Sequence, residues 1–257
     1  MTGDMASKQQ KAEFPERQAM NSKYFSFTDV LGYGWHVMAA NFWFFVGIGS
    51  VWLLITLLPT FAEMALDHLP LSKPVYVILK IATNLAGSII GIVLGIGIIK
   101  IALSFCDEQK PVFTTLFDAR DCFWRYLGTA ILYTLIVIGG CFLLFIPGII
   151  WAVKFGLCFY FVVDKGLDPV QALKASSRTT MGVKGELFAL GIIKIMIIYL
   201  GILCFLMGLF AAYPIVIVAS ALVYRQLLAQ TPDLAEFGIP VTSPQPPGGP
   251  LPGEQVF

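Results

Sequence analysis

The stretch Val75 to Phe105, VYVILKIATNLAGSIIGIVLGIGIIKIALSF, decides the fold class of this chain. A helix needs about 20 apolar residues to cross the hydrocarbon layer of a bilayer, and this stretch exceeds that length. Its charged residues are Lys80 and Lys100 alone, so water is a poor solvent for it. We therefore expect a transmembrane helix that tilts or extends past the lipid headgroups.

Further apolar runs flank this stretch on both sides. Pro147-Gly148 separates two of them and predicts a tight turn between antiparallel spans, and Pro214 suits the first turn of the last span. The runs are Phe42 to Leu66, Leu127 to Ile146, Ile149 to Val163, Leu187 to Leu209, and Tyr213 to Arg225. The sequence thus predicts an all-α membrane protein with six transmembrane helices.

The overall composition agrees with a lipid environment. Of the 257 residues, 57% are hydrophobic and 13% are charged, whereas soluble domains carry about 25% charged residues. The net charge of +1 provides no field that would attract nucleic acid. The first 25 residues lack an apolar core, so we expect no cleavable signal peptide.

Lys and Arg outside the spans predict the orientation. They concentrate in three segments that a six-span chain places on one side, while the other side has Lys73. Because basic loops stay in the cytoplasm, we expect a protein of the cell (inner) membrane with both termini cytoplasmic. The basic residues are Lys8, Lys11, Arg17 and Lys23, then Lys110, Arg120 and Arg125, and then Lys165, Lys174, Arg178 and Lys184.

Three cytoplasmic segments have the apolar stripe of an amphipathic helix, and each precedes two spans. They are Phe27 to Asn41, Phe113 to Tyr126, and Pro169 to Gly182, where Ala172, Leu173 and Ala175 share one side. Such helices tend to lie along the membrane surface. We interpret residues 26–230 as a membrane domain with a threefold repeat of interfacial helix plus transmembrane hairpin.

The two ends of the chain differ from this domain. Residues 1–25 are a polar cytoplasmic tail, and residues 231–257 are rich in Pro and Gly. The latter segment cannot bury a core of its own, so we expect a disordered cytoplasmic tail. It is either a spacer or a polyproline ligand for a partner.

Two groups of residues inside the spans are candidate sites. Gly87, Gly91 and Gly95 recur every fourth residue and form a groove, which packs either within the monomer or at a dimer seam. In either case a bulky residue at Gly91 should be costly.

Charged residues form the second group. Glu63, Lys80 and Lys154 lie in the outer parts of their spans, where they pair with one another or hold a lipid phosphate. Lys100 and Lys194 lie nearer the cytoplasmic ends, so we expect their side chains to snorkel to the headgroups.

Catalytic motifs are missing from the sequence. The two histidines, His36 and His68, lie outside the spans, and there is no P-loop or GxSxG motif. We therefore expect no enzyme activity, no metal and no cofactor. The five cysteines have no metal-ligand spacing and are expected to pack as small apolar side chains, with a Cys141–Cys204 bridge as the alternative.

The stretch Ile146 to Phe188, IPGIIWAVKFGLCFYFVVDKGLDPVQALKASSRTTMGVKGELF, resembles the glycerophosphoryl diester phosphodiesterase membrane-domain family and related uncharacterised bacterial multi-pass proteins. The opening FTDVLGYGWHVMAANFWFF looks like the first helix of that family. The matching residues are Pro147-Gly148, Asp164 to Gly166, and Ala172, Leu173, Ser176 and Gly182. The resemblance implies a helical membrane fold without phosphodiesterase chemistry, because that enzyme's catalytic site is in a separate soluble barrel.

These observations lead to two functional hypotheses. The first is a non-enzymatic membrane protein that organises lipids or partner proteins through its interfacial helices. Its partners would be membrane lipids and a membrane protein or a second copy of the chain, but no nucleic acid. The alternative is a small transporter or channel among the three hairpins, indicated by Pro59, Pro147 and Lys154.

Overall fold

The computed structural model describes residues 26–69, 72–107, 109–143, 145–203 and 207–239. Every regular element in these ranges is helical, which confirms the predicted all-α class. The α-helices are α2 (Phe27–Ala40), α3 (Phe42–Asp67), α4 (Lys73–Cys106), α5 (Phe123–Leu143), α6 (Phe145–Phe155), α7 (Cys158–Lys165), α8 (Pro169–Thr179), α9 (Lys184–Leu203) and α10 (Met207–Ala229). Two 3-10 helices, η1 (Phe113–Phe117) and η2 (Pro232–Phe237), complete the described part.

Six helical segments in the described ranges are long and apolar enough to cross a membrane, as predicted. Five of them are α3, α4, α5, α9 and α10, and the sixth combines α6 and α7 over Pro147–Lys165. With its 34 residues, α4 would measure about 51 Å at a rise of roughly 1.5 Å per residue. The chain is therefore a multi-pass membrane protein, and α4 is longer than one crossing requires.

The fourth span differs from the prediction at its start. α6 begins at Phe145, so Pro147 lies in the first helical turn instead of in the loop. A backbone N–H in that turn has no partner within the helix, and proline therefore costs nothing there. The expected Pro147-Gly148 turn was wrong.

The fourth span is also broken in the middle. α6 ends at Phe155 and α7 begins at Cys158, with Gly156 and Leu157 between them. The Gly156 N–H still donates to the Val153 carbonyl at 3.3 Å. This bond spans three residues, so the end of α6 forms a 3-10 turn before the break. After the break, the short helix α7 packs against α8.

The predicted amphipathic helix over Phe113 to Tyr126 forms only in part. η1 covers five residues, Phe113–Phe117, and α5 begins only at Phe123. Asp118 ends η1 with a non-helical backbone (φ −85°, ψ 74°), and its carboxylate accepts a hydrogen bond from Lys100 of α4 at 2.8 Å. The second repeat unit therefore starts with a short turn where the other two start with α2 and α8.

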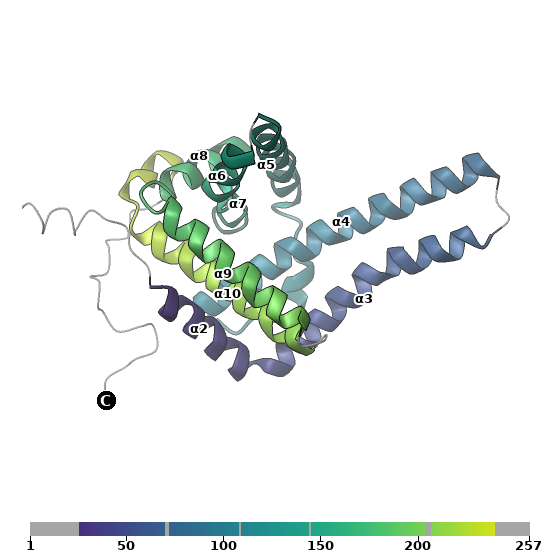
Figure 1. The fold of residues 1–257 in the computed structure, drawn as a ribbon, viewed down its shortest axis with the longest axis horizontal. Helices are drawn as coiled ribbons and strands as arrows, with labels where there is room; N and C mark the ends of the chain where they lie inside the picture. The colour runs from purple at the N-terminus through teal and green to yellow at the C-terminus, as the bar shows by residue number, and fades with distance from the viewer. Residues whose placement is uncertain (1–25, 70–71, 108, 144, 204–206, 240–257) are drawn as a thin grey trace, which may run out of the picture.

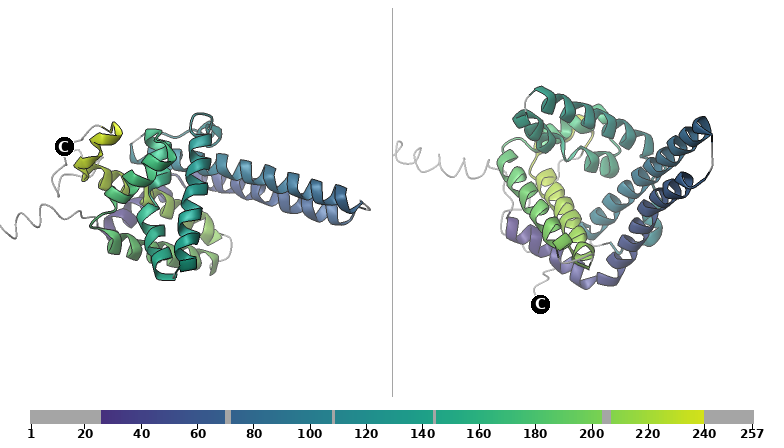
Figure 2. Two further views of the ribbon diagram at one scale, coloured as in Figure 1. Left: turned by 90° about the horizontal axis from the view of Figure 1, so that it is seen from above. Right: turned by 45° about the vertical axis from the view of Figure 1, so that its right-hand side comes forward.

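The three hairpins are arranged around a common centre. They are α3–α4, α5–α6 and α9–α10, and the right-hand view of Figure 2 shows them as the sides of a triangle. The α3–α4 hairpin extends far beyond the other two, while α2 runs alongside α9–α10 (Figure 1). The hairpins thus differ in direction as well as in length.

The core lies around α10. Val218, Ala219 and Tyr224 of this helix are fully buried, and α10 packs against α2, α4 and α9. At Gly34 of α2, an added Cβ would lie 2.8 Å from the Ile215 carbonyl oxygen, so glycine permits this close approach. The buried residues of α2 therefore pack against α10.

α8 is embedded in a similar way. Ala172, Leu173 and Ala175 are buried, which confirms the predicted stripe. The helix packs against α5 and α7. Both α2 and α8 thus have one face covered by protein.

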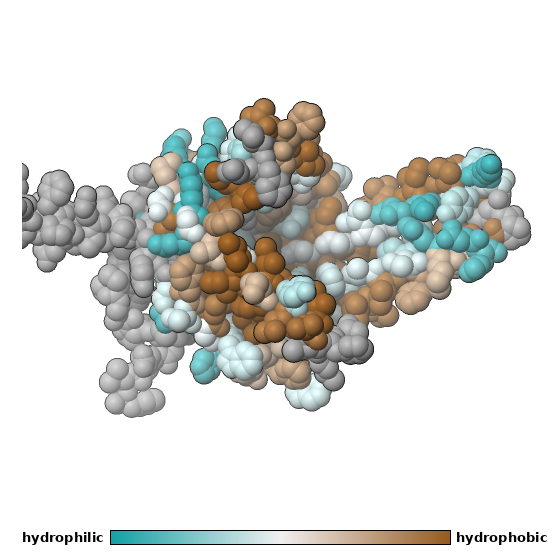
Figure 3. Space-filling view, in the orientation of Figure 1, coloured by the Kyte–Doolittle hydropathy of each residue, from teal (hydrophilic) through white to brown (hydrophobic). Residues whose placement is uncertain are grey.

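The remaining surface of the hairpins is strongly apolar. Large side chains such as Trp43, Trp124 and Phe142 are exposed. Figure 3 shows apolar surface over α9–α10 and along the outer edges of the projecting hairpin, with a more hydrophilic band between those edges. Soluble monomers rarely expose apolar patches of this extent. Lipid is the natural solvent for these faces.

The segment after α10 begins in an ordered form. Residues 231–239, expected in the disordered tail, include η2, and Leu234 and Ile239 are buried. Arg178 of α8 pairs with Glu236 at 2.6 Å. The tail prediction was wrong for these residues, because two apolar anchors and an ion pair hold them; residues 1–25 and 240–257 lie outside the described ranges.

Candidate functional site

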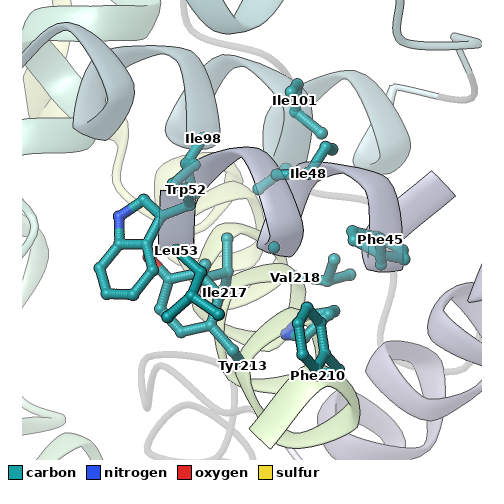
Figure 4. A pocket seen from close by; sticks show the side chains of 13 residues that line it. Phe45, Ile48, Trp52, Leu53, Ile98, Ile101, Phe210, Tyr213, Ile217 and Val218 are labelled. Carbon is teal, nitrogen blue, oxygen red and sulfur yellow. The ribbon is translucent and has the colours of Figure 1, made fainter. Parts of the chain in front are cut away.

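A pocket of about 110 Å³ lies between α3, α4 and α10 (Figure 4). Its lining contains no carboxylate, ammonium or imidazole group, and the polar side-chain atoms belong to Trp52 and Tyr213. The lining residues are Phe45, Ile48, Gly49, Trp52, Leu53, Ile98, Ile101, Ala102, Phe210, Tyr213, Pro214, Ile217 and Val218. The pocket is therefore lined almost entirely by apolar groups.

Helical periodicity explains why these residues meet. The α3 residues follow spacings of three and four, as do those of α10, so each helix presents one stripe to the pocket. Gly49 lets α10 approach, because an added Cβ would lie 2.7 Å from the Phe210 ring. The Trp52 and Tyr213 rings meet at 5.8 Å with an angle of 33°.

The size and lining of the pocket suit a hydrocarbon group. Apolar cavities of roughly this volume stay dry and take up apolar ligands. The pocket lies between three of the helices that are long and apolar enough to cross a membrane.

A charged cluster joins α4, α7 and α10 at one end of the molecule. Arg225 of α10 pairs with Asp164 of α7 at 2.9 Å and with Asp107, which follows α4, at 2.6 Å. The Tyr224 hydroxyl also donates to Asp164 at 2.9 Å. Each of the three charged residues comes from the second span of a different hairpin. We call Arg225, Asp107 and Asp164 the ionic node.

The sequence reasoning did not find the ionic node. It named Asp164 only within a motif and Arg225 only as the end of a span. The available signal was that an acidic or basic residue lies near the same end of each second span. That signal does not show that the three side chains contact one another.

The predicted group of outer charges is present only in part. Glu63 lies 4.0 Å from Lys80 and accepts a hydrogen bond from Asn84 at 2.6 Å, at the far end of the projecting hairpin. Lys154 does not join them, because it belongs to α6, where its ammonium lies over the Phe155 ring. Only Glu63 and Lys80 pair.

The backbone of Lys154 has a different role. Its carbonyl accepts a hydrogen bond from Ser176 at 2.9 Å, and the Thr180 hydroxyl, which lies 3.1 Å from the same oxygen, also lies 2.9 Å from the Ser176 carbonyl oxygen. Both hydroxyls belong to the α8 region and are buried. They stabilise the end of α6 just before the break in the fourth span.

The glycine groove in α4 has mixed surroundings. An added Cβ would lie 3.0 Å from the Pro59 ring at Gly87 and 3.2 Å from the Tyr126 hydroxyl at Gly95. Gly91 is exposed with nothing within 4 Å, so a larger residue there should be tolerated within one chain. The tight position is Gly97, where a Cβ would overlap the Leu116 carbonyl of η1.

The other two span lysines have polar partners within the protein. Lys100 pairs with Asp118 at 2.8 Å, and Lys194 donates to Ser220 of α10 at 3.2 Å. The pattern of one span cannot reveal these partners, and the snorkelling of both side chains stays a prediction.

The described cysteines are unbridged. Cys106, Cys122, Cys141 and Cys158 are free thiols, while Cys204, and with it the alternative bridge, lies outside the described residues. Burial raises the pKa of the Cys122 thiol. Within the described ranges no three His, Cys, Asp or Glu residues gather in a way that could hold a metal ion.

Comparison with family models, curated proteins and solved structures finds no match to this chain. The resemblance of residues 146–188 to the glycerophosphoryl diester phosphodiesterase membrane domain therefore stays a prediction.

Proposed function

We propose that this protein is a non-enzymatic, multi-pass protein of the cytoplasmic membrane that binds and organises membrane lipids. The apolar pocket between α3, α4 and α10 carries the proposal, because its lining offers hydrocarbon contacts and no catalytic group. The exposed apolar faces of the hairpins support the same role, since they would contact lipid on several sides. A membrane-protein partner or a second copy would add to this organisation.

The α3 and α4 residues of the pocket lie near one end of each helix, whereas its α10 residues begin three residues after Met207, at the opposite end of α10. The α4 residues of the pocket begin about 6 Å from the end of α4, and its α3 residues begin about 5 Å from the start of α3, at roughly 1.5 Å per residue. Both of these helix ends face the cytoplasm in the proposed orientation. Reporter fusions after His68 and after Gly166 test this orientation, which requires them to report opposite sides.

A photoreactive phospholipid tests the pocket. The full chain in nanodiscs is irradiated with a phosphatidylcholine that carries a diazirine in its acyl chain, and the cross-linked peptides are mapped. We expect labelling of α3 and α10 near the pocket. Leu53→Trp should reduce it, because an indole would fill the pocket that Leu53 lines.

The neighbouring residue supplies the matched control. Leu54 is 66% exposed and does not line the pocket, so Leu54→Trp should leave the labelling unchanged. Equal labelling of every lipid-facing surface, or no difference between the two variants, would contradict the proposal.

A second candidate function is a small transporter. The broken fourth span and the Lys194–Ser220 contact inside the α9–α10 pair favour it. Purified protein in liposomes distinguishes the two functions. Solute flux that disappears in Lys194→Met would favour transport, whereas no flux above empty liposomes would favour lipid binding.

A further inference from the structure

Lys194 lies in the middle of α9, with its charged end turned toward α10. At roughly 1.5 Å per residue, it is about 15 Å from the start of the helix and about 14 Å from its end. Its ammonium donates to Ser220 Oγ at 3.2 Å, and Ser220 donates in turn to the Val216 carbonyl at 2.6 Å. The Tyr160 side chain of α7 reaches the same Ser220 hydroxyl.

The charge of Lys194 is not balanced by the protein residues around it. Among the described residues, every ion pair involves another lysine or arginine. The carboxylates of the ionic node, Asp107 and Asp164, are already paired with Arg225. An ammonium has three N–H donors, so Lys194 keeps donors for a further acceptor. Ionisable groups inside spans normally mark a ligand or ion site.

The order of groups along α10 indicates what that acceptor belongs to. Ser220 lies about 7.5 Å from Arg225 of the ionic node and about 10.5 Å from Tyr213 of the pocket, at roughly 1.5 Å per residue. Tyr213 and Ser220 are nearly two turns apart and so share one face of α10. The sequence of groups from the cytoplasmic end is therefore charged node, ammonium, apolar pocket.

We propose that Lys194 and Ser220 bind the anionic headgroup of an amphiphile, a carboxylate or a phosphate, whose acyl chain occupies the pocket. This inference rests on the proposed lipid-binding function and adds the class of lipid that the site selects. The charge and the free N–H donors of Lys194 bind the anion, and the acyl chain extends from it along α10 toward Tyr213.

Quenching of Trp52 fluorescence tests the proposal. The full chain in phosphatidylcholine nanodiscs is titrated with dibromostearic acid, with its methyl ester and with a dibrominated phosphatidic acid. Bromine quenches indole fluorescence at short range, and Trp52→Phe identifies the signal from the pocket. We expect at least one of the two acids to bind about ten- to hundredfold more tightly than the ester, as for one charge-assisted hydrogen bond. Whichever of the two acids binds more tightly identifies the preferred headgroup as carboxylate or phosphate.

Two variants assign the preference to Lys194. Lys194→Met should remove it and leave ester binding unchanged, whereas Lys194→Arg should retain it. If the preference survives Lys194→Met, or if acids and ester bind equally to the native chain, the headgroup site is refuted while the pocket stands. If no probe quenches Trp52, both proposals fail.

Discussion

Neutralising the two acidic residues of the ionic node should have very different effects on stability. Asp164→Asn and Asp107→Asn each remove one carboxylate that contacts Arg225. The Asp107 contact is the shorter one, at 2.6 Å against 2.9 Å. Distance alone would therefore predict the larger loss for Asp107→Asn.

Burial predicts the opposite order. The Asp164 side chain is 11% exposed and also accepts from Tyr224 and pairs with Lys165, whereas Asp107 is 42% exposed. Loss of one partner from a buried ion pair costs about 3 kcal/mol, while an exposed pair contributes about 0.5 kcal/mol. We expect Asp164→Asn to lower the free energy of unfolding several times more than Asp107→Asn.

Thermal unfolding in detergent, followed by size-exclusion chromatography of the fluorescent fusion protein, measures the difference. Asp121→Asn is the control, because Asp121 is exposed and no described ion pair includes it. The midpoint should fall in the order Asp164→Asn, Asp107→Asn, control. Equal shifts for the two node variants, or a larger shift for Asp107→Asn, would refute the role assigned to burial.

Three further predictions follow from single positions. Gly97→Ala should destabilise the protein by about 1–3 kcal/mol through overpacking against η1, while Gly91→Ala should be neutral or slightly stabilising; thermal midpoints compare the two. Ser176→Ala and Thr180→Ala should each cost about 1 kcal/mol, because each removes a hydroxyl within hydrogen-bond distance of the Lys154 carbonyl, and a midpoint that does not change in either variant would contradict that role. Cys122 should react slowly with N-ethylmaleimide at neutral pH and faster as pH rises, because burial raises its pKa and keeps the thiol protonated; mass spectrometry with an SDS-unfolded sample as reference measures the rate.

The transmembrane helices could be predicted because their signal is local. The Val75 to Phe105 run needs lipid whatever the rest of the chain does, and α4 contains all of it. The position of Pro147 was harder, because proline suits both a turn and the first turn of a helix. A pattern along one segment does not distinguish these two placements.

The sites depend on contacts between distant segments, and sequence spacing does not contain them. The regular spacing of Gly91 correctly puts it on a helix face, but nothing in that spacing shows that the face is open. Lys194 meets Ser220 because α9 and α10 approach closely at Gly201, where a Cβ would lie 2.8 Å from Ala212 Cβ. The alignment of α9 with α10 that brings Lys194 to Ser220 depends on how the two helices pack, and the sequence of either helix alone does not show it.

The hydrogen bonds to the Lys154 carbonyl also bear on how the chain is made. Ribosomes add residues in order, and the two hydroxyls that reach this oxygen follow it by 22 and 26 positions. Because they follow both helices in the chain, Ser176 and Thr180 leave the ribosome after α6 and α7. The bend between them can therefore settle only after translation has passed α8, so the second hairpin matures together with the start of the third.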